Sequence, residues 1–146
     1  MATFADIPIL AESGRLAFPE IRLGVFPPVA AAVLPFRIGI ARTRDLLFSG
    51  RGVDAREALA MGLVSRVVPD AELEEAARAT ARQLAFHSGS SLRILRQALQ
   101  IGEMDSFRTI LREEEGLYLG RLMKTEDARE GLRAFLEKRK PVWRHR

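Results

Sequence analysis

The chain has 146 residues, of which 47% are hydrophobic and 29% are charged, so its composition is that of one folded soluble domain with a real core rather than a disordered segment. Its net charge of +4 is confined to the last ten residues, EKRKPVWRHR, which hold five basic side chains and one acidic side chain. The absence of cysteine excludes disulfides and thiolate chemistry, and two histidines are too few to suggest a metal-ligand cluster.

The sequence shows neither an amino-terminal secretory signal nor a membrane span. The amino terminus lacks the basic and then apolar pattern of a secretory signal. The longest uncharged stretch, which starts at Leu23, contains three prolines and is shorter than the roughly 20 apolar residues that a spanning helix needs. We therefore expect no membrane span, and we expect the protein to be cytoplasmic.

Short strands and turns are predicted at the start of the chain. Residues 6–12 and 15–18 are short runs separated by the turn-forming pair Ser13-Gly14. The prolines at 27 and 28 predict a helix that begins at residue 29, and Pro35 predicts its end, because proline suits the first turn of a helix and disrupts its interior.

Two further short helices are predicted before residue 62. One covers residues 42–48. The other covers residues 55–61, where Asp54 is placed to cap the first turn and Gly62 to provide the left-handed stop. These local signals predict the helix boundaries without reference to the rest of the fold.

The second half of the chain is predicted to be nearly all helix. A β-branched run over residues 63–68 ends at a proline, and Asp70 is then expected to cap a helix whose apolar positions recur at helical spacing up to Leu84. Similar apolar stripes follow Ser90 and Thr125. A few short strands do not make an independently stable sheet, so we expect sheet-forming sequence upstream of residue 1.

Three motifs occur in a fixed order: FPEIRLG, then LLFSGRGVDAREALAMGLVSRVVP, then TEDAREGLRAFLEKRKP. In order and spacing they resemble the enoyl-CoA hydratase/isomerase (crotonase) family from about residue 5 to the end. The resemblance implies an α/β fold, with a remnant of the family's ββα spiral in residues 1–69 and a helical region for oligomerisation and coenzyme A contact in residues 70–146. It also implies that the chain corresponds to the carboxy-terminal half of the family.

The resemblance implies a reaction on an acyl-CoA thioester, either hydration or a double-bond shift through a thioester enolate. Glu20 matches the carboxylate of the family's Pro-Glu-Ile segment, which moves a proton at the α-carbon. Its apolar neighbours suit this role, because such surroundings favour the neutral form of a carboxyl group. The family's second glutamate and its oxyanion hole have no counterpart here, so we expect the isolated chain to be inactive toward a 2-enoyl-CoA.

The same resemblance implies further contacts with the substrate. Pro19, Leu23, Gly24 and Pro28 match positions that line the acyl pocket. The stretch GVFPPVAAAVLP, which replaces a glycine-rich segment, is most similar to hydratases of cyclic dienoyl-CoA thioesters. No metal or other cofactor is expected, since coenzyme A enters only as part of the substrate.

Lys138 matches a basic position that contacts the coenzyme A phosphates, although a cation at a helix end also suits the helix dipole. We expect a homo-oligomer, a trimer or a dimer of trimers, or association with a paralogue. Two alternatives stay open: a non-catalytic assembly module, and RNA binding through the basic tail, where Trp143 would stack on a base. Nucleic acid is the less favoured partner, and Trp143 is expected to anchor the tail by packing.

Overall fold

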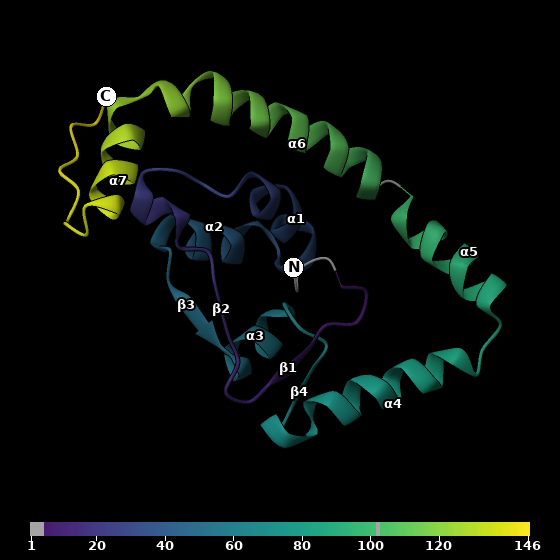
Figure 1. Cartoon of the computed structure of the whole chain (residues 1–146). Helices are drawn as coiled ribbons and strands as arrows, with labels where there is room; N and C mark the ends of the chain where they lie inside the picture. The colour runs from purple at the N-terminus through teal and green to yellow at the C-terminus, as the bar shows by residue number, and fades with distance from the viewer. Residues whose placement is uncertain (1–4, 102) are drawn as a thin grey trace. The chain divides into compact units, whose positions relative to one another are not determined.

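The computed structural model describes residues 5–101 and 103–146 (Figure 1). In chain order the elements are β1 (Ile9–Ala11), β2 (Arg15–Ala17), η2 (Pro19–Leu23), α1 (Pro28–Ile38), α2 (Ile40–Ser49), β3 (Gly52–Asp54), α3 (Ala55–Met61), β4 (Arg66–Val68), η3 (Asp70–Glu72), α4 (Leu73–Ala85), α5 (Gly89–Gln100), α6 (Glu103–Gly120), η4 (Leu122–Lys124) and α7 (Glu126–Leu136). Short strands and helices alternate up to residue 68, and helices follow. The predicted order of an α/β part and a helical part is confirmed.

The chain forms two compact units whose segments alternate along the sequence. One unit comprises Met1–Leu16 and Val53–Phe107, and the other comprises Ala17–Gly52 and Arg108–Arg146. The sequence instead suggested two consecutive regions that meet after residue 69. A boundary after residue 69 follows from the expected roles of the two regions, and it stays a prediction.

The first unit is organised around a short parallel pair of strands. β1 pairs with β4, with Ile9 opposite Arg66 and Ala11 opposite Val68. Next to them α3 begins where the Asp54 carboxylate accepts the Glu57 N–H at 2.8 Å, and it ends at Gly62, whose φ is 86°. Both predicted boundaries of this helix are confirmed. Its buried residues pack with their neighbours into a small apolar core: Ala11, Val53, Ala55, Ala58, Leu63 and Val64.

Asp70 does not cap a helix, contrary to the prediction. Its carboxylate accepts hydrogen bonds from the backbone N–H of Ser13, at 3.1 Å, and from the Ser13 hydroxyl. These bonds lower the pKa of Asp70. A 3₁₀ turn occupies residues 70–72, and α4 begins only at Leu73. The prediction was wrong because a partner 57 residues away in the sequence occupies the carboxylate.

The second unit is built from η2, α1, α2, the part of α6 from Arg108 onward, η4 and α7. The helix α1 crosses the proline that was expected to end it. The helix continues through Pro35 to Ile38. Leu34 and Ile38, one turn apart, are 0% and 7% exposed, and α1 packs along α2, where Leu46 is 1% exposed. Burial of two large side chains contributes about 3 kcal/mol or more, which offsets the roughly 3 kcal/mol cost of an interior proline.

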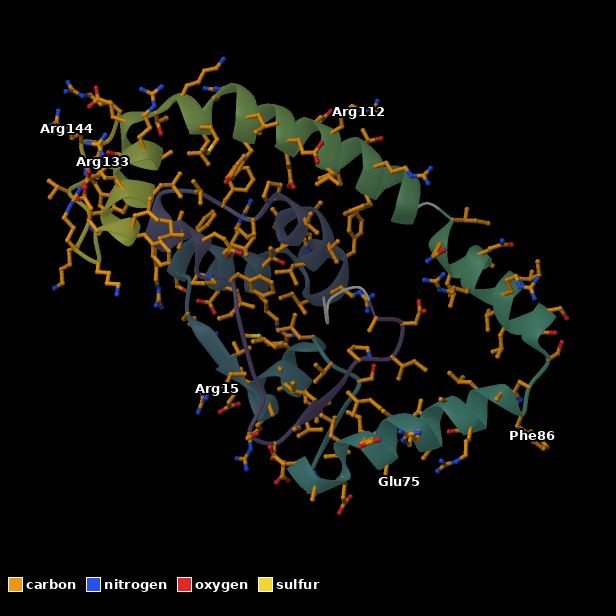
Figure 2. The ribbon with its side chains drawn as sticks, viewed as in Figure 1. Arg15, Glu75, Phe86, Arg112, Arg133 and Arg144 are labelled. Carbon is orange, nitrogen blue, oxygen red and sulfur yellow. The ribbon has the colours of Figure 1, made fainter. Side chains whose placement is uncertain are left out.

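The helices α4 and α5 have the predicted apolar stripes but bury no side chain. Phe86, in the turn between them, is 91% exposed and projects away from the ribbon in Figure 2. Ile94, Leu95 and Leu99 of α5 are 63%, 55% and 69% exposed. The spacing therefore predicted the helices correctly, while their apolar faces stay open to solvent. No helix in the described ranges is long and apolar enough to cross a membrane.

Candidate active site

Glu20 lies in a single 3₁₀ turn, η2, whose backbone is closed by hydrogen bonds. Pro19 occupies the first position, where its fixed φ suits a helical start. Gly24 ends the turn with a φ of 69°, and its N–H donates to the carbonyl of Ile21 at 3.1 Å. The N–H of Val25 donates to the carbonyl of Glu20 at 3.4 Å. The turn therefore has a defined shape around the candidate catalytic residue.

Two glycines allow neighbouring helices to pack closely against this turn on two sides. At the end of α2, a Cβ atom on Gly50 would lie 2.9 Å from Cγ2 of Ile21. In α7, a Cβ atom on Gly131 would overlap the carbonyl oxygen of Leu23. Because protein interiors are close-packed, neither α2 nor α7 has room to move toward η2. The position of the Glu20 backbone thus depends on contacts with two helices that are distant in sequence.

The Glu20 side chain is half-buried, and one of its carboxyl oxygens is shielded. Its Oε2 has no significant exposed surface and accepts no hydrogen bond from the described residues. A buried acceptor without a partner costs about 1–3 kcal/mol, and such groups in native structures call for an explanation such as a catalytic role. A shielded carboxyl group of this kind is suited to exchange a proton with a bound ligand.

The other predicted pocket residues lie in the same stretch of the second unit as Glu20. Pro19 begins η2, and Pro28 begins α1. The carbonyl of Leu23 faces Gly131 of α7. A Cβ atom on Gly24 would lie 2.9 Å from the carbonyl oxygen of Asp127 and 3.1 Å from Cζ3 of Trp143. Leu23 and Gly24 thus contact α7 and the tail, and their contact with a substrate stays a prediction.

Lys138 ends α7 in an unusual backbone conformation. Its φ is 52°, in the left-handed region that glycine normally occupies at this position. Its N–H donates to the carbonyl of Phe135 at 3.1 Å, and the N–H of Arg139 donates to that of Ala134 at 3.0 Å. These two bonds make a Schellman motif. The exposed side chain is open to an anionic ligand, and its predicted contact with coenzyme A stays a prediction.

Glu114 of α6 is a candidate that the sequence reasoning missed. Its Oε2 is also shielded and without a hydrogen bond from the described residues, and desolvation raises the pKa of this carboxyl to about 7. Glu114 falls at helical spacing within the apolar stripe that includes Leu111 and Tyr118. Tyr118 in turn meets Phe26 edge to face, with ring centroids 5.4 Å apart. An acidic residue inside an apolar stripe was the signal available in the sequence.

The basic tail is largely paired with acidic side chains. Arg139 contacts Glu130 and Glu137, and Arg144 and Arg146 contact Glu126. A hollow of about 310 Å³ beside α7 is lined by side chains of both signs, among them Arg133 and Arg144, which Figure 2 labels. These pairings do not favour RNA binding, which stays a prediction. Among the residues whose side chains are described, no cluster of three potential metal ligands occurs.

Comparisons with known proteins agree on one family. The family model described as Enoyl-CoA hydratase/isomerase matches residues 1–146. The cyclohexa-1,5-dienecarbonyl-CoA hydratase of Thauera aromatica is 40% identical over 146 residues, which cover 100% of this chain and 56% of the relative. A probable enoyl-CoA hydratase of Mycobacterium bovis is 40% identical over 147 residues, with 57% of its length covered. The chain thus spans a little over half the length of these relatives.

Solved structures give the same result. An enoyl-CoA hydratase/isomerase from Pseudoalteromonas atlantica superposes with a TM-score of 0.86 at 28% identity, covering 97% of this chain and 57% of that chain. A carnitinyl-CoA hydratase from Mycobacterium avium superposes with a TM-score of 0.85 at 29% identity, covering 99% of this chain and 57% of that chain. The backbone of the described residues thus follows that of both enzymes over most of its length.

Proposed function

Because the chain belongs to the enoyl-CoA hydratase/isomerase family, we propose that it takes part in hydration or double-bond movement on an acyl-CoA thioester. The match over residues 1–146 supports this reaction class, as do relatives whose names specify CoA thioesters. Such reactions pass through an enolate whose charge develops on the thioester oxygen. They require a group that moves a proton at the adjacent carbon.

Glu20 is that group. The observation that carries this assignment is its Oε2 atom, which is shielded from water and without a hydrogen bond from the described residues, in a turn that two helices hold in place. In the proposed complex this oxygen faces the α-carbon of the bound thioester and takes or returns the proton there. Acid–base work by one positioned carboxyl group accelerates a reaction by about a hundredfold to ten-thousandfold.

We further propose that the acyl part of the thioester substrate is a cyclic dienoyl group. Support comes from the relative in Thauera aromatica, whose name specifies cyclohexa-1,5-dienecarbonyl-CoA. It also comes from the stretch after the Glu20 turn, where Pro27 is the N-cap of α1 and Pro28 is its first residue. Prolines and alanine side chains in place of a glycine-rich segment would give the pocket a stiffer wall.

We assign the contact with the coenzyme A phosphates to Lys138, because its exposed ammonium group carries a charge opposite to theirs. The chain is further proposed to assemble with copies of itself or with a paralogue. The open apolar faces of α4 and α5 support assembly, because contiguous apolar surface of this kind usually marks an interface. The same observation favours the second candidate function, a non-catalytic assembly module.

Exchange of the α-proton of butanoyl-CoA with D2O tests the Glu20 assignment. The purified chain is expected to bind the thioester and to catalyse a slow exchange, because Glu20 is present while an oxyanion hole, which stabilises the enolate, is not expected among these residues. The Glu20→Gln variant is expected to slow the exchange by about a hundredfold or more with a Kd within twofold of the parent. Glu12→Gln, at an exposed carboxylate of the other unit, is the matched control. Equal exchange by parent and Glu20→Gln, or no binding by the parent chain, would contradict the proposal.

Full hydration is a separate question, because it requires water to be positioned as well. The expectation that these 146 residues alone do not hydrate crotonyl-CoA stays a prediction. The measurement is the loss of crotonyl-CoA absorbance at increasing protein concentration. A rate that rises in proportion to the protein would show the prediction to be wrong.

A further inference from the structure

The last five residues fold back along α7 and bind to its acidic side chains. Figure 1 shows this segment, in yellow, running alongside α7 toward the start of that helix. The N–H groups of Arg144 and His145 donate to the Asp127 carboxylate at 2.6 and 2.8 Å. The carbonyl of Arg146 accepts the N–H of Glu126, at the start of α7, at 3.0 Å. We call residues 142–146 and their contacts with α7 the tail clasp.

Glu130 completes the tail clasp. Its Oε1 accepts the N–H of Val142 at 3.0 Å, and its carboxylate binds the guanidinium of Arg139 through both oxygens. These bonds, that from Arg139 first, lower the pKa of Glu130 to about 2. The carboxylate therefore stays ionised and able to accept both donors over the whole range in which the protein would function.

The tail clasp places Trp143 against the Glu20 turn. A Cβ atom on Gly24 would lie 3.1 Å from Cζ3 of the indole, and one on Gly131 would lie 3.0 Å from its Cη2 atom. The ring thus fills the space next to two glycines, one at the end of η2 and one in α7. Trp143 is 36% exposed, so more of the residue's surface is covered by protein than is open to solvent.

We propose that Trp143 is a positioning residue for Glu20: the indole, held by the tail clasp, keeps Gly24 in its left-handed conformation and thereby keeps η2 closed. Gly24 is the point at which the turn is most deformable, because glycine has access to far more backbone conformations than other residues. The N–H of Gly24 donates to the carbonyl of Ile21, and this hydrogen bond closes η2. The catalytic meaning of this positioning rests on the proposed function of Glu20.

Amide hydrogen exchange measured on the full chain by NMR tests the positioning. In Trp143→Ala, the N–H groups of Gly24 and Val25 are expected to exchange at least tenfold faster than in the parent. The N–H groups of Leu46 and Leu47 in the core of α2 are expected to stay within twofold. Val142→Ala, at a neighbouring side chain that is 68% exposed, is the matched control. Acceleration of all amides alike, or of none, would overturn the proposal.

Asp127→Ala supplies an independent variant that leaves the indole intact and removes the acceptor of two tail amides. Trp143 is the single tryptophan of the chain, so its fluorescence reports the release of the tail. The emission is expected to shift to longer wavelength, together with faster exchange at Gly24 and Val25. A red shift with unchanged exchange at those two amides would overturn the proposal.

The α-proton exchange of butanoyl-CoA then separates positioning from catalysis. Trp143→Ala is expected to lower its rate at saturating thioester about tenfold or more, with Kd within twofold. Trp143→Phe, which keeps a ring in the space, is expected to recover most of the rate. A change in Kd alone would contradict a positioning role. If Glu20→Gln had no effect on this rate, the proposed function would fail, while the amide-exchange result would stand.

Discussion

Two glutamates of the second unit share an unusual feature, a carboxyl oxygen that is shielded and without a hydrogen bond from the described residues. Only Glu20 lies in a motif that assigns it a role. Glu114 lies in a run of three glutamates, and the composition of this run suggests an ordinary solvent-facing helix. The other two glutamates of the run are indeed exposed. The difference between it and its neighbours is its place in the apolar stripe of α6. Helical periodicity therefore identifies an acidic residue that composition does not.

The shielding of Glu114 predicts a pH-dependent stability. Its carboxyl keeps a proton up to about pH 7 when folded, against an ordinary value of 4.5, so the parent loses stability as the pH rises from 4.5 to 7. Above pH 7, Glu114→Gln is expected to be more stable by about 1 kcal/mol, a figure reduced for partial solvent screening.

Urea midpoints from pH 4 to pH 8 measure this difference. It is expected to vanish near pH 4, where the carboxyl is neutral in both the folded and the unfolded chain. Glu113→Gln, at the exposed neighbour, is the control and is expected to follow the parent. A constant difference across the pH range would argue against the raised pKa of Glu114.

The left-handed backbone of Lys138 predicts that one substitution raises the stability of the chain while it weakens ligand binding. A left-handed conformation costs a residue with a Cβ atom about 1–2 kcal/mol, so Lys138→Gly is expected to raise the free energy of unfolding by about 1 kcal/mol. The same change removes the cation proposed to bind the coenzyme A phosphates. A weaker Kd for butanoyl-CoA alongside a higher urea midpoint is the expected result, and an unchanged Kd would rule out the phosphate contact.

At the scale of the elements, the helix α7 packs closely against η2 because its residue 131 is a glycine, which has no side chain. Gly131 has no side chain where the carbonyl of Leu23 approaches, and it leaves space for the indole of Trp143. The helix itself is predictable, since Thr125 accepts the N–H of Ala128 at 3.1 Å as an N-cap and begins it as expected. Its contact with η2 is what links the carboxy-terminal motif to the Pro-Glu-Ile motif.

Adding one methyl group at Gly131 is therefore expected to be costly. In Gly131→Ala, α7 would have to move off η2, with an expected loss of about 2 kcal/mol in the free energy of unfolding. Gly116→Ala is the matched control in α6, because no atom lies within 4 Å of its added Cβ. There the better helix propensity of alanine is expected to stabilise by roughly 0.5–1 kcal/mol. Equal effects of the two changes in urea unfolding would contradict the close contact.

At the scale of the whole molecule, the two units each bury a small core, yet much apolar surface stays exposed. α5 exposes Ile94, Leu95 and Leu99, and a shallow, open groove on this helix is lined by Ser90, Ser91, Ile94, Leu95 and Ala98. Single proteins seldom expose patches of this kind without a partner. The surface is the physical reason to expect association, whatever the partner.

Light scattering measures that association. The purified chain is expected to have a mass above the 16.3 kDa of one copy. Leu95→Lys, which places a charge in the groove, is expected to move the mass toward that of a single copy. Gln97→Lys adds the same charge to α5 outside the groove lining and is the control. A monomeric parent, or equal effects of the two lysines, would contradict association through this face.

The sequence by itself determined the features that depend on near neighbours in the chain. The helix from Ala55 to Met61 begins and ends as predicted, because Asp54 and Gly62 act on backbone groups within a few residues. The family also followed from the order of three motifs, while the match of Glu20 to the family's catalytic carboxylate stays a prediction. Trp143 was expected to pack, and it does so against Gly24 and Gly131.

Tertiary structure alone decided the features whose partners are distant in sequence. Asp70 binds Ser13 instead of a helix end, and α1 crosses Pro35 because Leu34 and Ile38 are buried. The tail reaches the Glu20 turn because it folds back along α7, which places Trp143 next to Gly24. In each case a contact with a partner distant in sequence determines the outcome, and the local sequence does not contain that partner.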